Sequence, residues 1–259
     1  MSRRLLVVLC AAIYLFLILP LVVVFPISFS SAPYMQFPPP GFSTQWYERY
    51  LDDPQWIDAT VRSLYIGGAT AVLALALGVP LAFALARGRF AGRLLVDRIA
   101  LAPLVVPTII LSVGLYGLFA KLKLIGEWYG LVAAHTVLAL PFVVLVTVAG
   151  LRDFDRALEQ AAEGLGASRL QTLLRVTLPL LRPSLVSAGL LAFISSFDEL
   201  VVALFLAGPN MTLPKKMFDN IMMEIDPTIA AVSVMQILLV SIVLVLIGRF
   251  GRGLQGSAR

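Results

Sequence analysis

The sequence contains one cysteine and one histidine, and charged residues make up only 14% of its 259 residues. A disulfide within the chain needs two cysteines, so Cys10 alone excludes one, and it also excludes a cysteine pair that binds a metal. Because His135 is the only histidine, a catalytic acid and base built from two histidines is excluded as well. The sequence also lacks G-x-x-x-x-G-K-[S/T], the loop that cradles nucleotide phosphates. Any energy from ATP must therefore come from another subunit.

Apolar residues are abundant instead, at 59% of the chain, well above the roughly 45–50% of soluble domains. A helical crossing of a bilayer needs about 20 mostly apolar residues. Six runs of that length lie near residues 5–27, 61–86, 99–120, 130–151, 184–206 and 228–248. They are much longer than the roughly 9–11 residues of a barrel strand. The sequence therefore predicts an all-α membrane protein, with a single transmembrane domain of six helices over 1–259.

The basic residues predict the orientation of the chain, because lysine and arginine accumulate in short cytoplasmic loops. If both termini are cytoplasmic, only six of the 20 lysine and arginine residues face outward: Arg49, Arg62, Lys121, Lys123, Lys215 and Lys216. The net charge of +5 then reflects this bias and contact with lipid headgroups. It does not support nucleic-acid binding.

The first apolar run could instead be a cleaved signal peptide, since Arg3 and Arg4 precede it. Its apolar stretch is longer than the roughly 7–15 residues of a signal-peptide core. We therefore expect a retained first helix, in which Cys10 is a small apolar side chain.

The segment between the first two runs is rich in proline, serine and aromatic residues, and should lie on the outer surface. Its aromatic side chains suit the interfacial belt of a membrane protein. They also suit a docking surface for an extracytoplasmic partner. The sequence leaves both interpretations open for Tyr34, Trp46, Tyr47, Tyr50 and Trp56.

A polar stretch over 152–183 separates the fourth and fifth runs, on the predicted cytoplasmic side. Apolar residues in its first part repeat at i, i+3, i+4 and i+7, which predicts a short helix with one apolar face. That face comprises Leu158, Ala161, Ala162 and Leu165, and Glu159, Gln160 and Glu163 point away from it.

A turn and a second helix are expected to follow. Gly166 permits a turn that a residue with a side chain would resist. Ser168 and Gln171 match the capping box that begins a helix, and Pro179 should break or kink that helix before the fifth run. Such a cytoplasmic element, with apolar faces, either lies on lipid headgroups or inserts into another protein.

This stretch resembles the EAA loop of permease subunits of binding-protein-dependent ABC importers. That loop reads Glu-Ala-Ala, three residues, Gly, nine residues, then Ile-x-Leu-Pro, and it falls here on Ala161, Ala162, Gly166, Val176, Leu178 and Pro179. Gln160 replaces the glutamate, and Gly164 replaces an acidic residue usual at its position. The resemblance implies a coupling helix that docks on an ATPase through Gln160, Ala161, Ala162, Gly166, Ala167, Leu178 and Pro179.

The resemblance covers the whole chain, and SSFDELVVALFLAGPNMTLPKKMF at 195–218 is similar to the C-type permease of spermidine/putrescine importers. It implies the type I importer permease fold in a bacterial inner membrane. The implied partners are a second permease of the B type, two ATPase subunits that bind ATP and Mg, and a periplasmic solute-binding protein. It implies no cofactor in this chain, and a polyamine as solute, with an amino-acid-like solute as the alternative.

Asp198 and Glu199 are two acids inside the fifth apolar run. A charge near a helix centre costs roughly 2.5–3.5 kcal/mol on insertion scales, so such residues usually face a cavity, a partner helix or a pathway. In a continuous helix Ser195, Asp198 and Glu199 share one face. They either link neighbouring helices or line a pathway that favours a cationic solute.

Two other classes fit less well. Asp153 and Asp155 could bind a divalent metal in a membrane enzyme, but at the start of a predicted helix they are more simply caps. A secondary transporter usually has internal repeats and paired broken helices. Pro80, Pro107 and Pro141 could break helices, but the two halves of the sequence show no repeated pattern.

Overall fold

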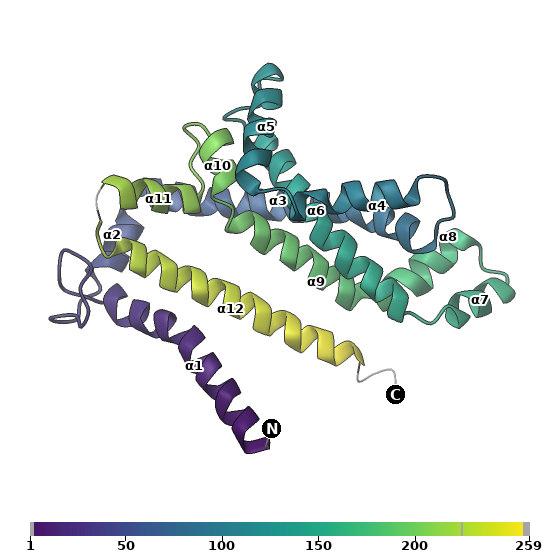
Figure 1. Ribbon diagram of the computed structural model, residues 1–259, viewed down its shortest axis with the longest axis horizontal. Coiled ribbons are helices and arrows are strands. Elements are labelled where there is room, and N and C mark those ends of the chain that lie inside the picture. Colours follow the sequence, from purple (N-terminus) through teal and green to yellow (C-terminus); the bar gives the residue numbers. More distant parts are fainter. Residues whose placement is uncertain (1–2, 224, 256–259) are drawn as a thin grey trace. The chain divides into compact units, whose positions relative to one another are not determined.

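The computed structural model describes residues 3–223 and 225–255, and the regular elements of this part of the chain are helices (Figure 1). Its α-helices are α1 Arg3–Ser28, α2 Gln45–Asp52, α3 Pro54–Arg87, α4 Arg93–Leu101, α5 Thr108–Lys121, α6 Trp128–Asp153, α7 Ala157–Gly164, α8 Arg169–Thr172, α9 Leu178–Phe197, α10 Val201–Leu206, α11 Leu213–Met223 and α12 Thr228–Gln255. A 3-10 helix, η1 Ala102–Leu104, follows α4, and a π-helix, η2 Leu173–Thr177, precedes α9. The predicted all-α class is confirmed.

The chain divides into two compact units. The first runs to Asp58 and also includes 216–244, so it holds α1, α2 and much of α12. The second comprises 59–215 with the end of α12, and it holds most of α3 and all of α4 to α10.

The loop after α1 in the first unit is fixed by packing and hydrogen bonds. The indole Nε1 of Trp46 donates to the carbonyl of Ser30 at 2.7 Å. Trp46, Tyr50 and Trp56 are buried, at 6%, 7% and 2% exposure, whereas Tyr34 is 58% exposed. Three of the five aromatic side chains considered for an interfacial belt therefore pack inside this unit, because aromatic rings contribute large buried apolar surfaces to a core.

The centre of the second unit is the antiparallel pair of α6 and α9, which lie side by side (Figure 1). Ala139, Ala188 and Ala192 at their contact are fully buried. Small residues let helix backbones approach closely, which is how helices associate where lipid supplies no hydrophobic driving force. A second cluster around Leu131 and Val202 joins the start of α6 to α3, α5 and α10.

The helix predicted over 99–120 is wrong as a continuous helix. The segment Arg93–Leu104 and the helix Thr108–Lys121 are bent by 104° at the break between them. Pro103 and Pro107 stand four residues apart at this break. Each proline removes a backbone donor and disfavours helical geometry in the residue before it, so the hydrogen-bond ladder cannot continue.

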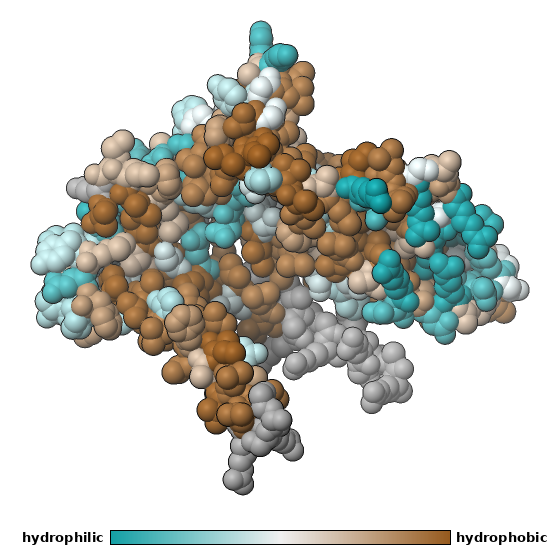
Figure 2. Space-filling model, viewed as in Figure 1, coloured by the Kyte–Doolittle hydropathy of each residue, from teal (hydrophilic) through white to brown (hydrophobic). Residues whose placement is uncertain are grey.

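Four helices in the described chain are long and apolar enough to cross a membrane: Leu5–Ser28, Pro54–Arg87, Trp128–Asp153 and Arg169–Phe197. The bent pair of α4 and α5 makes five if it counts as one span. In the sixth predicted run, 228–248, the apolar helix Thr228–Ile242 is present, but the side chains of 243 and 246–248 lie outside the described residues. Six spans and cytoplasmic termini therefore stay predictions. Figure 2 shows the hydrophobic surface of α1.

Candidate functional site

The expected helix, turn and helix of the polar stretch form at the end of α6. The Asp155 carboxylate accepts a hydrogen bond from the backbone N–H of Ala157 at 2.9 Å and so caps α7. Ser168 and Gln171 exchange reciprocal hydrogen bonds at the start of α8, which confirms the predicted capping box. The surface over α7 and α8 is mostly hydrophilic (Figure 2).

Gly166 makes the turn between these two helices with a backbone that favours glycine. Its φ is +93°, in the left-handed region that other residues rarely adopt. A Cβ at this position would meet no atom within 4 Å. The requirement for glycine is therefore conformational and not steric. Gly164, two residues earlier, has the same open space without a positive φ.

One ion pair fastens α7 to the end of α3. Nη1 of Arg87 donates to the two carboxylate oxygens of Glu159 at 2.5 and 2.6 Å, and the Thr177 hydroxyl donates to the same carboxylate. The side chains of Arg87 and Glu159 are only 22% and 16% exposed. The guanidinium also lies 5.4 Å from the ring centre of Phe83 and 5.6 Å from that of Phe154. These contacts join α3, α7 and η2.

The same neighbours control the charge of Glu159. Burial alone would raise the pKa of its carboxyl, but the hydrogen bonds from Arg87 and Thr177 and the positive charges of Arg87 and Arg156 outweigh burial and lower the pKa below 4.5. Glu159 is therefore ionised at neutral pH, and the ion pair is intact under physiological conditions.

The two faces of α7 have different neighbours. Glu159 on the polar face is held by this chain, whereas Leu158 and Leu165 on the apolar face are 48% and 91% exposed. Exposed apolar side chains on such an element suit contact with another protein. Sequence reasoning missed the role of Glu159, because Arg87 lies 72 residues away along the chain and no local pattern connects them.

The other residues of the EAA-like pattern lie along the same element. Gln160 and Ala161 are exposed on α7, Ala162 and Ala167 are partly buried, and Leu178 begins α9. All of them belong to the second unit.

Of the two outcomes predicted for Pro179, a break or a kink, the break is not formed, and the kink stays a prediction. The chain is helical from Arg169 to Phe197, with η2 immediately before α9. In a π-helix each N–H bonds to a carbonyl five residues back instead of four. This local change of register occurs just where Pro179 supplies no N–H donor, and it lets the helix continue.

The fifth predicted run is interrupted at its two acids, because α9 and α10 are separated by residues 198–200. Asp198 follows the last turn of α9, and its side chain is exposed. Glu199 accepts a hydrogen bond from the backbone N–H of Val202 at 3.0 Å and so caps α10. Ser195 remains inside α9 and is partly buried. The continuous helical face expected for these three residues is therefore not formed.

A buried chain of hydrogen bonds lies next to this break. Nδ1 of His135 is 2.7 Å from Oγ of Ser196, and the Ser196 hydroxyl donates to Oγ1 of Thr70 at 3.3 Å. The three residues come from α6, α9 and α3, and their exposure is 1%, 6% and 0%. The serine that links helices is therefore Ser196, next to the Ser195 that the spacing singled out.

Comparison with known proteins identifies the family. Residues 74–256 match the family described as the binding-protein-dependent transport system inner membrane component. The chain belongs to this family. It is therefore a permease, a non-catalytic inner-membrane subunit of an ABC importer that works with an ATPase and a periplasmic binding protein.

Several relatives of the permease are known. It is 32% identical over 228 residues to the spermidine/putrescine transport system permease protein PotC of Haemophilus influenzae, covering 88% of each chain. It is 37% identical over 201 residues to the putrescine transport system permease protein PotI of Escherichia coli, covering 74% of the permease and 72% of that protein.

The fold of the permease is also found in a solved structure. A bacterial ABC transporter involved in the import of the acidic polysaccharide alginate matches with a TM-score of 0.74 and 22% identity, covering 96% of the permease and 98% of that chain. This likeness supports the importer-permease fold.

Proposed function

We propose that this permease forms half of the pathway for a small cationic solute of the polyamine class. It spans the membrane six times with both termini in the cytoplasm, and it pairs with a second permease of the B type. Two ATPase subunits bind ATP and Mg and engage α7 and α8, and a periplasmic binding protein delivers the solute. The names of PotC and PotI support the solute class.

The observation that carries this proposal is the exposed carboxylate of Asp198 at the break between α9 and α10. The 20 residues of α9 span about 30 Å, which is about the thickness of the hydrocarbon core. Since α9 begins next to the cytoplasmic element, Asp198 lies near the outer end of this crossing. An unpaired negative charge there attracts cations to the entrance of a pathway.

The test is uptake of labelled putrescine and spermidine into vesicles that contain the whole importer, with saturating binding protein and matched amounts of complex. Asp198→Asn should slow uptake several-fold, and Glu199→Gln should act in the same direction. Asp52→Asn, at an exposed acid at the end of α2, controls for the loss of one negative charge.

The outcomes separate the alternatives. Undiminished cation uptake by the double variant Asp198→Asn, Glu199→Gln would remove both acids from the pathway. Loss of assembly in the Glu199 variant alone would assign that residue to the capping of α10. Uptake of an amino-acid-like zwitterion in preference to polyamines would replace the proposed solute class, and uptake driven by a proton gradient without ATP would contradict the importer mechanism.

A further inference from the structure

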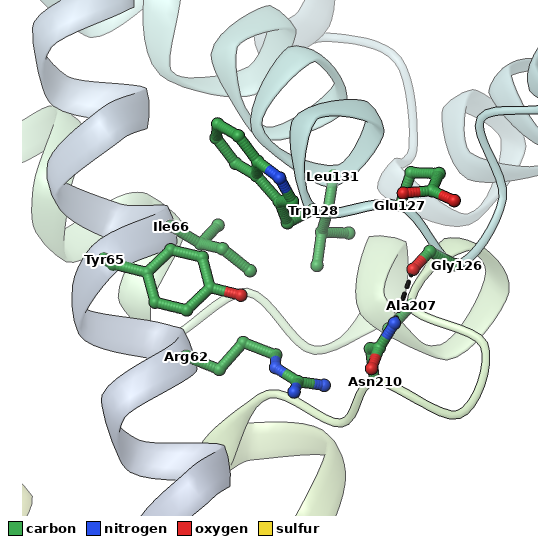
Figure 3. Close-up of a pocket in the computed structure, with 9 residues that line it drawn as sticks. All are labelled: Arg62, Tyr65, Ile66, Gly126, Glu127, Trp128, Leu131, Ala207 and Asn210. Atoms are coloured by element: carbon green, nitrogen blue, oxygen red, sulfur yellow. Dashed lines mark hydrogen bonds between the residues drawn. The ribbon is translucent and has the colours of Figure 1, made fainter.

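A polar cavity of about 230 Å³ lies near the start of α3, in the second unit (Figure 3). Its lining comes from α3, from the turn between α5 and α6 together with the start of α6, and from the stretch after α10. Arg62 on α3 is 25 residues before Arg87, which is about 37 Å along the helix axis. The cavity is therefore at the opposite end of α3 from the bond between Arg87 and Glu159.

Arg62 makes no ion pair within the described chain, although Glu127 also lines the cavity. Nε of Arg62 is buried and has no hydrogen-bond acceptor among residues 3–223 and 225–255, and its guanidinium makes no ion pair with them. Arginine cannot lose its proton at physiological pH. A buried donor of a charged group without an acceptor is costly, so the site favours a ligand that brings an anionic acceptor.

The donors that surround the cavity have the geometry of a carboxylate site. Arg62 and Tyr65 are one turn apart on α3, and Figure 3 shows their guanidinium and phenol hydroxyl pointing into the same space. Nδ2 of Asn210 donates to the carbonyl of Gly126 at 2.6 Å and keeps a second N–H. Guanidinium groups bind carboxylates with two parallel hydrogen bonds. Glu127 lies on the other side of the cavity from Arg62.

A cationic solute does not suit this cavity, because Arg62 would repel it. A carboxylate presented by a protein does suit it, and the periplasmic binding protein has to dock at this end of the permease when the cytoplasmic element lies at the other. We infer that the Arg62 cavity receives an aspartate or glutamate side chain of the periplasmic binding protein when that protein docks. The inference rests on the orientation given in the proposed function and deepens it by naming a docking contact.

The experiment measures the Kd of the solute-loaded binding protein for the complete importer in nanodiscs, without nucleotide, at several salt concentrations. Arg62→Gln should raise the Kd about tenfold and flatten its salt dependence, because one pair of opposite charges across the interface is lost. Arg62→Lys keeps the charge but cannot make two parallel hydrogen bonds to one carboxylate. Its Kd should therefore lie between those of the native importer and Arg62→Gln. Tyr65→Phe should raise the Kd by a smaller factor than Arg62→Gln.

The matched control is Lys121→Gln at the end of α5, which removes the same charge from an exposed residue that does not line the cavity. It should change the Kd less than about twofold, as expected for a rim charge. Basal ATP hydrolysis should be unchanged in Lys121→Gln. In a double-mutant cycle, neutralising one acidic residue of the binding protein should raise the Kd for the unaltered importer. The same substitution should have little further effect on the Kd for the Arg62→Gln importer.

An unchanged Kd in fully assembled Arg62→Gln importer would overturn the inference. Loss of the second permease from the Arg62→Gln complex would show that the cavity binds that permease, and it would also overturn the inference. A third result would also overturn the inference: an Arg62→Gln importer that keeps the Kd for the binding protein but needs more solute for the same uptake. The carboxylate that binds Arg62 would then belong to the solute. Orientation is tested separately: labelling of Lys123→Cys by an impermeant thiol reagent only from the cytoplasmic side would refute the proposed topology whatever the Kd values.

Discussion

The two ends of α3 carry the same residue type, but only one of the two arginines has an ionic partner in the described chain. Arg87 at its last turn is held by Glu159 and lies over two aromatic rings, whereas Arg62 near its start faces a cavity without an ionic partner in the described chain. The first end is closed by the chain itself. The second is completed only by another molecule. One helix can therefore hold α7 through an ion pair at one end and present an arginine to a second molecule at the other.

Under the proposed function, the contacts of Arg87 let the element of α7 and α8 transmit force from the ATPase. The hydrogen bonds of Glu159 to Arg87 and Thr177 fix the position of α7 relative to α3 and to η2, which leads into α9. The apolar face of α7 stays exposed, while the polar face is anchored, and the proposed function assigns the exposed face to the ATPase. A push on the element should therefore move α3 and α9 together.

The largest effect expected at the closed end comes from Gly166→Val. A β-branched residue at φ +93° is strongly disfavoured, so the turn between α7 and α8 should be lost and ATP-driven uptake should fall at least tenfold. Gly164→Val is the control, because it has the same open space without the positive φ and should keep more activity. Membrane insertion should be normal in both variants. Normal uptake by assembled Gly166→Val importer would remove the docking role of this element.

The next prediction compares Arg87→Gln with Arg62→Gln, the same substitution near the two ends of α3. Arg87→Gln leaves Glu159 without its ion pair and should lower the free energy of unfolding by about 1.5–3 kcal/mol, the range for hydrogen bonds to charged groups. Arg62→Gln should change it by less than about 0.5 kcal/mol, as for a substitution that breaks no contact. Unfolding of the purified permease in mixed detergent micelles measures both. Equal destabilisation would show that the two ends do not differ as described.

Local signals predicted the parts of this region that depend on neighbouring residues. The capping box of Ser168 and Gln171 and the turn at Gly166 are formed as expected, because each needs only contacts within a few positions. The prolines alone did not show where a helix breaks, because their effect depends on contacts with residues distant in the sequence. Pro107 stands at a break, whereas Pro80 and Pro141 lie inside continuous helices. Tertiary packing decides which prolines a helix tolerates.

Distant pairings could not be predicted from spacing. The bond between Arg87 and Glu159 spans 72 residues, and the contact between His135 and Ser196 spans 61. Periodicity assigned Glu159 to the polar face of α7 correctly but could not show that this face meets α3. The acids at 198 and 199 were found from their apolar context, yet their different roles depend on a helix end that the context did not reveal.

A smaller effect follows from the charge of Glu159. Its pKa is lower in the folded state than its usual value of 4.5, so the stabilisation is present above that value and disappears as the pH falls through the folded pKa. The stability difference between the native permease and Glu159→Gln should therefore be constant from about pH 6 to 8 and shrink below about pH 4.5. Glu163→Gln, on the same helix, controls for general acid effects. A difference that grew on acidification would contradict the assigned contacts.

The smallest effect is expected from Gln160→Ala, next to Glu159 on α7. Gln160 is exposed and makes no hydrogen bond through its side chain with the described residues, and it has no charge to contribute where the family carries glutamate. Alanine also favours helix slightly more than glutamine. Stability should therefore change by less than about 0.5 kcal/mol, and uptake should fall far less than in Gly166→Val. Parallel uptake assays on Gln160→Ala, Glu159→Gln and Gly166→Val should give that order, from mildest to most severe. If Gln160→Ala were the most severe, the exposed family position would matter more than the anchored one, and the coupling role would pass from the bond with Arg87 to a direct contact with the ATPase.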